Sequence, residues 1–239
     1  MNCAIILAGG IGERMGTQIP KQFIKVNNKP IIVYAMENFE KHPLIDLIEV
    51  VCLKGYEEFI WNYAKEYNIT KLKYVTIGGD NCQDSTRNGL YNLENICKND
   101  DIILISMSSY PLMSSEIITD CIEVAKKYGN AVSASSAILD IFYTDDNISS
   151  EKYIERDKMK VITAPTAFKF EEVLQMYKLA YKEKKCIKGN VYAPNIYIEY
   201  GKKIYFSKSE RTNIKITNKE DLILMEMYLE FINGGKKYE

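Results

Sequence analysis

The chain has 239 residues, of which 46% are hydrophobic, so it is long enough to bury a core in one large α/β domain or two small ones. Its formal net charge is −1, which provides no basic field for nucleic acid. No apolar run reaches the roughly 18 residues of a membrane span, and MNCAIILAGG lacks the length and charged start of a signal peptide. We therefore expect a cytoplasmic protein without a nucleic-acid or membrane partner.

The cysteine and histidine contents restrict the chemistry that is available. The six cysteines are scattered and none forms a CxxC pair, which argues against zinc binding and thioredoxin-type redox chemistry and fits a reducing cytosol. His42 is the one histidine in the sequence, which argues against Ser–His catalysis and against a metal site built from several histidines.

Strands and helices alternate through the first half of the chain. Short apolar runs predict strands at residues 3–8, 44–53, 72–79, 101–106 and 131–139. Helical apolar spacing predicts helices at residues 30–42, 59–68, 84–97 and 114–129. Asp84 or Ser85 is the expected N-cap of the third helix, and Gly129 ends the fourth. This alternation indicates right-handed βαβ units and a parallel sheet.

The alternation breaks between residues 141 and 160, a polar segment without glycine that we interpret as a projecting arm. Residues 170–185 follow as a helix, and residues 191–209 predict a short strand pair hinged at Gly201. Residues 213–232 predict a last strand and a terminal helix with Asn218 as N-cap. Because no repeat or linker interrupts the pattern, we expect a single domain over residues 1–239.

The segment LAGGIGERMGTQIPKQF, residues 7–23, joins the first strand to a glycine loop and to two cations, Arg14 and Lys21. Ligands of open parallel sheets bind at the carboxyl ends of strands, where glycines let backbone N–H groups approach phosphate. The two cations would neutralise charge that develops on the phosphates. The segment predicts triphosphate binding, and a simple tight turn is the alternative.

Two other glycine-loop classes fit less well. The Walker pattern GxxxxGK[ST] is absent. A nicotinamide-binding loop is a nearer alternative, because GGIGERMG contains GxG and Tyr181 and Lys185 form a YxxxK pair. However, the acidic residue expected after the second strand has no clear candidate, and a YxxxK pair arises easily by chance in a chain rich in Lys and Tyr.

Several ordered segments resemble one family. LAGGIGERMG, PKQF, NKPIIVYAMENF, GGDNCQDSTRNGL, ERDKM and NIKITNKEDL resemble the cytidylyltransferases that make CDP-activated alcohols. This group contains 2-C-methyl-D-erythritol 4-phosphate cytidylyltransferase and ribitol-5-phosphate cytidylyltransferase, and LAGG, MENF and RDKM look more like the ribitol-phosphate branch. The resemblance covers nearly the whole chain. It implies a three-layer Rossmann-like nucleotidyltransferase fold with a mixed, mostly parallel sheet and a projecting dimerisation arm at about residues 141–160.

By this resemblance, the enzyme condenses CTP with a polyol phosphate, such as ribitol 5-phosphate, to a CDP-alcohol and pyrophosphate. The acceptor phosphate attacks the α-phosphorus, Mg²⁺ is the cofactor, and the protein is a homodimer. The product would serve a capsule or wall polymer. The alternative acceptor is 2-C-methyl-D-erythritol 4-phosphate, for isoprenoid synthesis.

The resemblance also implies roles for individual residues. Arg14 and Lys21 would bind the triphosphate, and Lys215 would approach the α-phosphate from the far side. The nucleotide would be cradled by Ala8, Gly9, Gly10, Gly12, Gly79 and Ser85. Arg156 would bind the acceptor phosphate, often across the dimer. Taken alone, Lys215 also fits a solvated cation, and Arg156 fits a surface ion pair with Asp157.

One stretch, ISMSSYPLMSS, departs from the family pattern. Met107 stands where relatives carry an aspartate that holds Mg²⁺, and a thioether is a poor ligand for a hard cation. Tyr110 and Cys82 each stand in an arginine position, and residues Thr163–Thr166 replace QTPQ.

Three interpretations follow from these departures. In the first, the triphosphate itself supplies most of the ligands of the Mg²⁺ ion, with Asp80, Asp84 or Asp140 recruited to it. In the second, the acceptor differs from that of the relatives. In the third, the chain is a catalytically weak or inactive nucleotide-binding paralogue.

Overall fold

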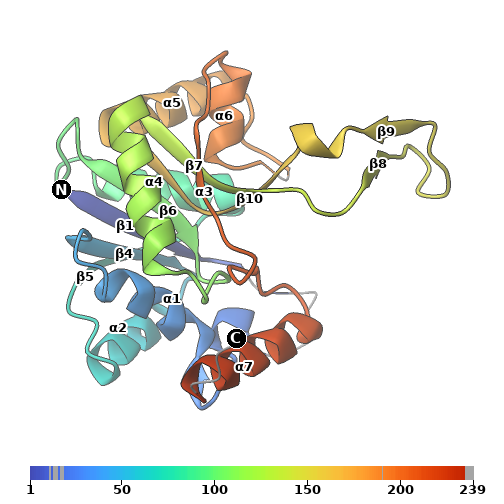
Figure 1. Cartoon of the computed structure of the whole chain (residues 1–239). Helices are drawn as coiled ribbons and strands as arrows, with labels where there is room; N and C mark the ends of the chain where they lie inside the picture. The colour runs from blue at the N-terminus through green and yellow to red at the C-terminus, as the bar shows by residue number, and fades with distance from the viewer. Residues whose placement is uncertain (11, 13–15, 17–18, 190, 235–239) are drawn as a thin grey trace.

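A seven-stranded mixed sheet forms the centre of the computed structural model, which describes residues 1–10, 12, 16, 19–189 and 191–234 (Figure 1). The strand order is β11-β7-β10-β6-β1-β4-β5. The strands are β1 (Asn2–Ala8), β4 (Leu47–Cys52), β5 (Leu72–Ile77), β6 (Ile102–Met107), β7 (Asn130–Ser136), β10 (Lys160–Lys169) and β11 (Phe206–Lys208). Strands β6, β1, β4 and β5 run parallel, as do β7 and β11, whereas β10 is antiparallel to both of its neighbours. The predicted mixed, mostly parallel sheet is confirmed.

Helices cover both faces of this sheet and complete three layers. One face packs against α1 (Ile31–Glu40), α2 (Glu57–Glu66) and α4 (Ser115–Tyr128). The other packs against α3 (Cys82–Asn92), α5 (Phe170–Glu183) and α6 (Ala193–Glu199). All seven residues of β1 are buried, because a central parallel strand is covered on both faces. Its alternate side chains therefore divide between two hydrophobic cores.

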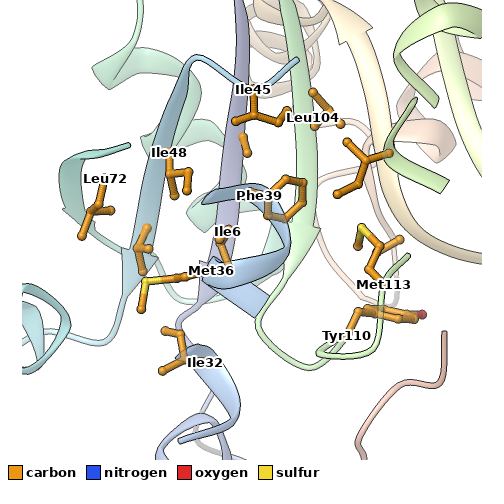
Figure 2. Close-up of a cluster of buried hydrophobic side chains, with 14 of the residues drawn as sticks. Ile6, Ile32, Met36, Phe39, Ile45, Ile48, Leu72, Leu104, Tyr110 and Met113 are labelled. Atoms are coloured by element: carbon orange, nitrogen blue, oxygen red, sulfur yellow. The ribbon is translucent and has the colours of Figure 1, made fainter. Parts of the chain in front are cut away.

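The first of these cores reaches the carboxyl edge of the sheet. Figure 2 shows Ile6 and Leu104 from neighbouring strands together with Met36 and Phe39 from α1. Tyr110, just beyond β6, belongs to the same buried cluster (Figure 2). This packing anchors the loop after β6 and so fixes the residues around it.

Most predicted helices occur where expected, with corrected boundaries. Asn81 caps α3, because its Oδ1 accepts a hydrogen bond from the Asp84 backbone N–H at 3.0 Å; the expectation of Asp84 or Ser85 was wrong by a few residues. The C-cap at Gly129, with φ +92°, and the N-cap at Asn218 of α7 (Lys219–Asn233) are confirmed.

Two predictions near the C-terminal end were wrong. The expected strand pair over residues 191–209 is helix α6 followed by β11 alone. Residues 213–217 are an extended segment outside any strand. Its Ile216 N–H donates to the Ser109 carbonyl at 2.8 Å, and the buried Ile216 side chain packs with α7. This single backbone hydrogen bond and a small hydrophobic core hold the segment in place of the strand pairing that we expected.

An arm projects from the edge of the sheet, as Figure 1 shows. It contains the antiparallel pair β8 (Ile141–Tyr143) and β9 (Lys152–Ile154) and the short helix η3 (Arg156–Lys158). Earlier in the chain, η2 (Lys21–Phe23) and the pair β2 (Lys25–Val26) and β3 (Lys29–Pro30) lead into α1. In the described part of the chain, no helix is long and apolar enough to cross a membrane.

Candidate active site

Two cavities meet at the carboxyl edge of the parallel strands. The polar cavity has a volume of about 520 Å³ and the apolar cavity about 490 Å³. The polar cavity is bounded by loops after β1, β4, β5 and β6, as expected for ligand binding in an open parallel sheet. Five residues line both cavities: Leu7, Cys82, Met107, Tyr192 and Lys215.

Two glycine segments form one wall of the polar cavity. Gly79 donates its N–H to the Ser85 Oγ at 3.1 Å, and this hydroxyl donates to the Asn81 carbonyl at 3.0 Å. A Cβ at Gly79 would lie 2.2 Å from the Asp84 Cβ, so no side chain fits there. A Cβ at Gly9 would lie 3.3 Å from the Ser85 Oγ. The two loops therefore approach closely through the start of α3.

Lys21 is held at this wall by its neighbours in η2. The Gln22 Nε2 donates to the Ala8 carbonyl at 2.7 Å, in a buried position directly below the glycine loop. The Phe23 ring stacks on Tyr56 of the α2 entry at 4.8 Å between centroids. The Lys21 Nζ donates to the Ile216 carbonyl at 3.0 Å. Because Gln22 and Phe23 are both anchored, the ammonium has a defined position beside the polar cavity.

Lys215 reaches the junction of the cavities from the C-terminal segment. The buried Ile216 next to it anchors the segment on the loop after β6 and on α7. The Lys215 ammonium lies 5.5 Å from the centroid of the Tyr192 ring. Among the described residues, no ion pair of Lys215 with a carboxylate is found, so its charge stays available to an anionic ligand.

The apolar cavity contains one charged side chain among its described lining residues, which is Lys215. Burial raises the pKa of the Cys82 thiol to about 11, against the opposing effect of Lys215, and raises the pKa of Tyr110 to about 12. Both groups are therefore neutral at pH 7. The Ser106 Oγ is buried and has no hydrogen-bond partner among the described residues.

The donor set fits a protein-bound Mg²⁺ poorly. Met107 ends β6 between the two cavities and offers only a thioether. In the part of the chain that the structure describes, no three His, Cys, Asp or Glu side chains are grouped to hold a metal ion. Among the described residues that line the polar cavity, Asp80 is the one with a carboxylate, and it is exposed. Asp84 is instead engaged by Tyr181, whose hydroxyl donates to it at 2.7 Å.

The structure brings most of the expected site residues together. Those that line the polar cavity are Gly9, Gly10, Lys21, Gly79, Ser85 and Lys215. Ala8 lies beneath them, and Gly12 adjoins Lys21: with φ +74°, its Cβ would lie 2.9 Å from the Lys21 Cβ. Arg156 lies on the arm, paired with Asp140 at 3.5 Å and outside both cavities. Arg14 falls outside the described residues.

Sequence reasoning missed three residues at this edge. Gln22 lies within the PKQF segment, but its buried contact with Ala8 is not visible from the sequence. Asn81 carried a usable signal, since Asn before a helical pattern is a preferred N-cap. Tyr192 was missed because residues 191–209 were assigned to strands; Pro194 near the start of α6 is the signal that would have indicated a helix.

The chain is similar to known cytidylyltransferases over nearly its whole length. A family model described as 2-C-methyl-D-erythritol 4-phosphate cytidylyltransferase matches residues 2–231. A ribitol-5-phosphate cytidylyltransferase of Lacticaseibacillus paracasei is 37% identical over 96% of this chain and 98% of its own. A 2-C-methyl-D-erythritol 4-phosphate cytidylyltransferase of Clostridium tetani is 33% identical over 98% and 93%.

A solved structure shares the fold. The 4-diphosphocytidyl-2C-methyl-D-erythritol synthase of Anaerococcus prevotii superposes with a TM-score of 0.80 at 23% identity, covering 96% of each chain. The expected three-layer Rossmann-like nucleotidyltransferase fold is thus confirmed. The family match spans nearly the whole chain and includes the residues that line both cavities. The chain belongs to the 2-C-methyl-D-erythritol 4-phosphate cytidylyltransferase family.

Proposed function

We propose that this chain transfers a cytidylyl group from CTP to a polyol phosphate, with ribitol 5-phosphate as the preferred acceptor. The proposal rests on the junction of the two cavities, where Lys215 lines both the polar cavity with its glycine wall and the apolar cavity. A nucleotide triphosphate in the polar cavity would place its α-phosphorus near the mouth of the apolar cavity. The higher identity to the relative named for ribitol 5-phosphate, 37% against 33%, supports that acceptor.

The reaction requires positioning and charge stabilisation rather than a covalent enzyme intermediate. A phosphate oxygen of the acceptor attacks the α-phosphorus of CTP and forms a new P–O bond. The bond from the α-phosphorus to the oxygen that bridges to the β-phosphate breaks, and pyrophosphate leaves with that electron pair. Negative charge accumulates on the oxygens around phosphorus, where preorganised cations have their largest effect.

The residues on the two sides of the junction divide this work. Backbone N–H groups near Gly9 and Gly10 would meet the phosphates, and Lys21 would offset charge on the triphosphate. Lys215 would stabilise the oxygens of the α-phosphate, because its ammonium lines both cavities.

Mg²⁺ would add charge neutralisation to the triphosphate when it is bound. Since the described residues fit a protein-held ion poorly, we propose that it arrives with CTP, coordinated by phosphate oxygens and water. Replacing Met107 by Asp introduces the missing type of ligand and is a useful comparison variant.

A homodimer through the arm is part of the proposal. The arm carries large side chains that are far more exposed than core residues, including Phe142 at 62%, Ile148 at 90% and Tyr153 at 74%. Exposed apolar side chains of this kind mark protein interfaces. In such a dimer, Arg156 of the partner subunit would reach the acceptor phosphate, which Arg156 does not reach within its own chain. We also propose that the chain acts as one nucleotidyltransferase domain.

The first experiment measures pyrophosphate release from CTP and Mg²⁺ with ribitol 5-phosphate, 2-C-methyl-D-erythritol 4-phosphate and glycerol 3-phosphate in parallel. We expect turnover with ribitol 5-phosphate, and stronger thermal stabilisation by CTP than by ATP, GTP or UTP. The Met107→Asp variant is assayed beside the natural chain. Turnover only in that variant would overturn the catalytic proposal and identify a nucleotide-binding paralogue. Turnover only with the methylerythritol phosphate would overturn the acceptor assignment alone.

A further inference from the structure

Tyr192 provides an aromatic wall at the place where the two cavities meet. It lines both cavities, and its ring faces the Lys215 ammonium at 5.5 Å from the ring centroid. The ring is 37% exposed, so the pair is accessible to a ligand. Of the five residues shared by both cavities, Lys215 alone is charged, and the Tyr192 ring is the aromatic face that it meets.

We propose that the ring of Tyr192 is a positioning element that holds the Lys215 ammonium at the junction, a role that rests on the function proposed above. An aromatic face attracts a cation through its quadrupole and leaves the positive charge uncompensated. A carboxylate at the same place would neutralise the ammonium and compete with phosphate for it. The ring therefore limits the positions of a flexible lysine while keeping its full charge for the α-phosphate.

The backbone around Tyr192 allows the ring to be tested without disturbing the helix. Tyr192 precedes α6, and its backbone N–H donates to the Asn195 Oδ1 at 2.8 Å. This bond is independent of the side chain at position 192, so replacing the ring leaves it in place. α6 itself is anchored by buried Ile196 and Tyr197 in the core beneath. The Tyr192 ring is thus separable from the fold of the segment that carries it.

The kinetic test compares Tyr192→Leu with Tyr192→Phe. We expect Tyr192→Leu to lower kcat about three- to thirtyfold, with little change in KM for CTP, because the ammonium acts on charge that develops in the transition state. Tyr192→Phe keeps the ring and should retain near-natural kcat. In a Lys215→Met background, Tyr192→Leu should have no further effect. Equal losses in the Phe and Leu variants, or additive effects with Lys215→Met, would overturn the proposal.

A matched control lies at the other end of α6. The Lys185 ammonium lies 5.2 Å from the centroid of the Tyr200 ring, and neither residue lines the two cavities. Tyr200→Leu removes a similar cation–ring contact at the end of α6, together with the hydrogen bond from the Tyr200 hydroxyl to Glu183 at 2.8 Å. Its kcat should stay within about twofold of the natural value, since no charge develops near it. A loss like that of Tyr192→Leu would instead indicate general loosening of α6 and would contradict the specific role of Tyr192.

A ligand-free measurement separates this inference from the proposed reaction. Reductive ¹³C-methylation keeps lysine ammonium groups charged and makes them visible by NMR, with Lys215→Arg identifying the signal of Lys215. The ring current of Tyr192 should displace this signal in the natural chain and in Tyr192→Phe, but not in Tyr192→Leu. An unchanged signal in Tyr192→Leu would overturn the inference. Absence of turnover in the natural chain, with the signal displaced as expected, would overturn the proposed reaction alone.

Discussion

The Nζ of Lys21 donates a hydrogen bond to the carbonyl oxygen of Ile216 at 3.0 Å, joining segments that lie 195 residues apart. Lys21 follows the glycine loop, and Ile216 follows Lys215 in the C-terminal segment. Ile216 is also tied to the loop after β6 through its N–H and the Ser109 carbonyl at 2.8 Å. The three segments around the polar cavity are therefore connected to one another, and the two lysines are positioned together.

Lys21→Ala should reduce kcat/KM for CTP by at least about a hundredfold, because a preorganised cation is removed from the developing charge. It also removes the bond to the Ile216 carbonyl, so the C-terminal segment should exchange its amide hydrogens faster. Steady-state kinetics and hydrogen exchange measure the two effects. Lys25→Ala, at an exposed position in β2, is the control. Near-natural kinetics for Lys21→Ala would remove Lys21 from the site.

Gly79→Ala and Gly10→Ala should behave differently. At Gly79 a Cβ would lie 2.2 Å from the Asp84 Cβ, so the start of α3 must move, and we expect both a lower Tm and weaker CTP binding. At Gly10 no atom of the described residues beyond its chain neighbours lies within 4 Å of the new Cβ, so the Tm should be unchanged while the KM for CTP rises. Thermal unfolding with and without CTP compares them. An unaffected KM in Gly10→Ala would place the phosphates elsewhere.

Buried apolar runs carried most of the fold prediction. The strands β1, β4 and β6 are buried on both faces, and their largely apolar runs are visible in the sequence because parallel central strands are covered twice. The segment that became α6 misled the prediction, since its Tyr and Ile residues favour strands. There the helical spacing of Ile196, Tyr197 and Tyr200 against the core prevailed over local propensity.

The site was predictable where local chemistry determines it and unpredictable where distant segments meet. Glycines next to strands indicate a phosphate loop by themselves, and the cavity they line was anticipated. The pairing of Tyr192 with Lys215 depends on how α6 and the C-terminal segment pack, which no local pattern encodes. Likewise, the bond from Lys21 to Ile216 joins the two ends of the chain.

Glu49 should make the protein less stable as the pH rises. This carboxyl is fully buried in β4, where desolvation raises its pKa to about 7 despite hydrogen bonds from Thr76 at 2.5 Å and Asn92 at 3.1 Å. A raised pKa in an acid favours the protonated folded state. Stability is therefore highest below the unfolded pKa of about 4.5, decreases as the pH passes from there to 7, and stays low above it.

Glu49→Gln should remove this dependence. The amide oxygen can accept from both Thr76 and Asn92, so the variant should match the natural protein at pH 5 and exceed it at pH 8 by on the order of 2 to 3 kcal/mol. Urea unfolding at both pH values measures the free energy of unfolding. Glu58→Gln, at an exposed position on α2, is the control. A difference of equal size at pH 5 and pH 8 would show that charge burial is not the cause.

Arg156 should act on the acceptor of a partner subunit rather than in its own chain. It lies on the exposed arm, away from both cavities, so Arg156→Ala should raise the KM for the acceptor phosphate and leave CTP binding unchanged. Phe142→Asp, placed opposite Tyr153 in the β8–β9 register, should produce monomers with the same acceptor defect. Sedimentation velocity gives the oligomeric state, and acceptor titrations give the KM.

Mixing two impaired variants, assayed at an acceptor concentration at which each has little activity, decides between action within and across subunits. Lys215→Met keeps Arg156 but lacks the cation at the cavity junction, whereas Arg156→Ala keeps Lys215. After equal amounts are unfolded and refolded together, about half of the dimers contain one of each, and one site in every such dimer has both residues if Arg156 acts across the interface. Activity should then recover to about a quarter of the natural level. No recovery, with mixed dimers present, would place Arg156 in its own subunit's reaction or outside the reaction altogether.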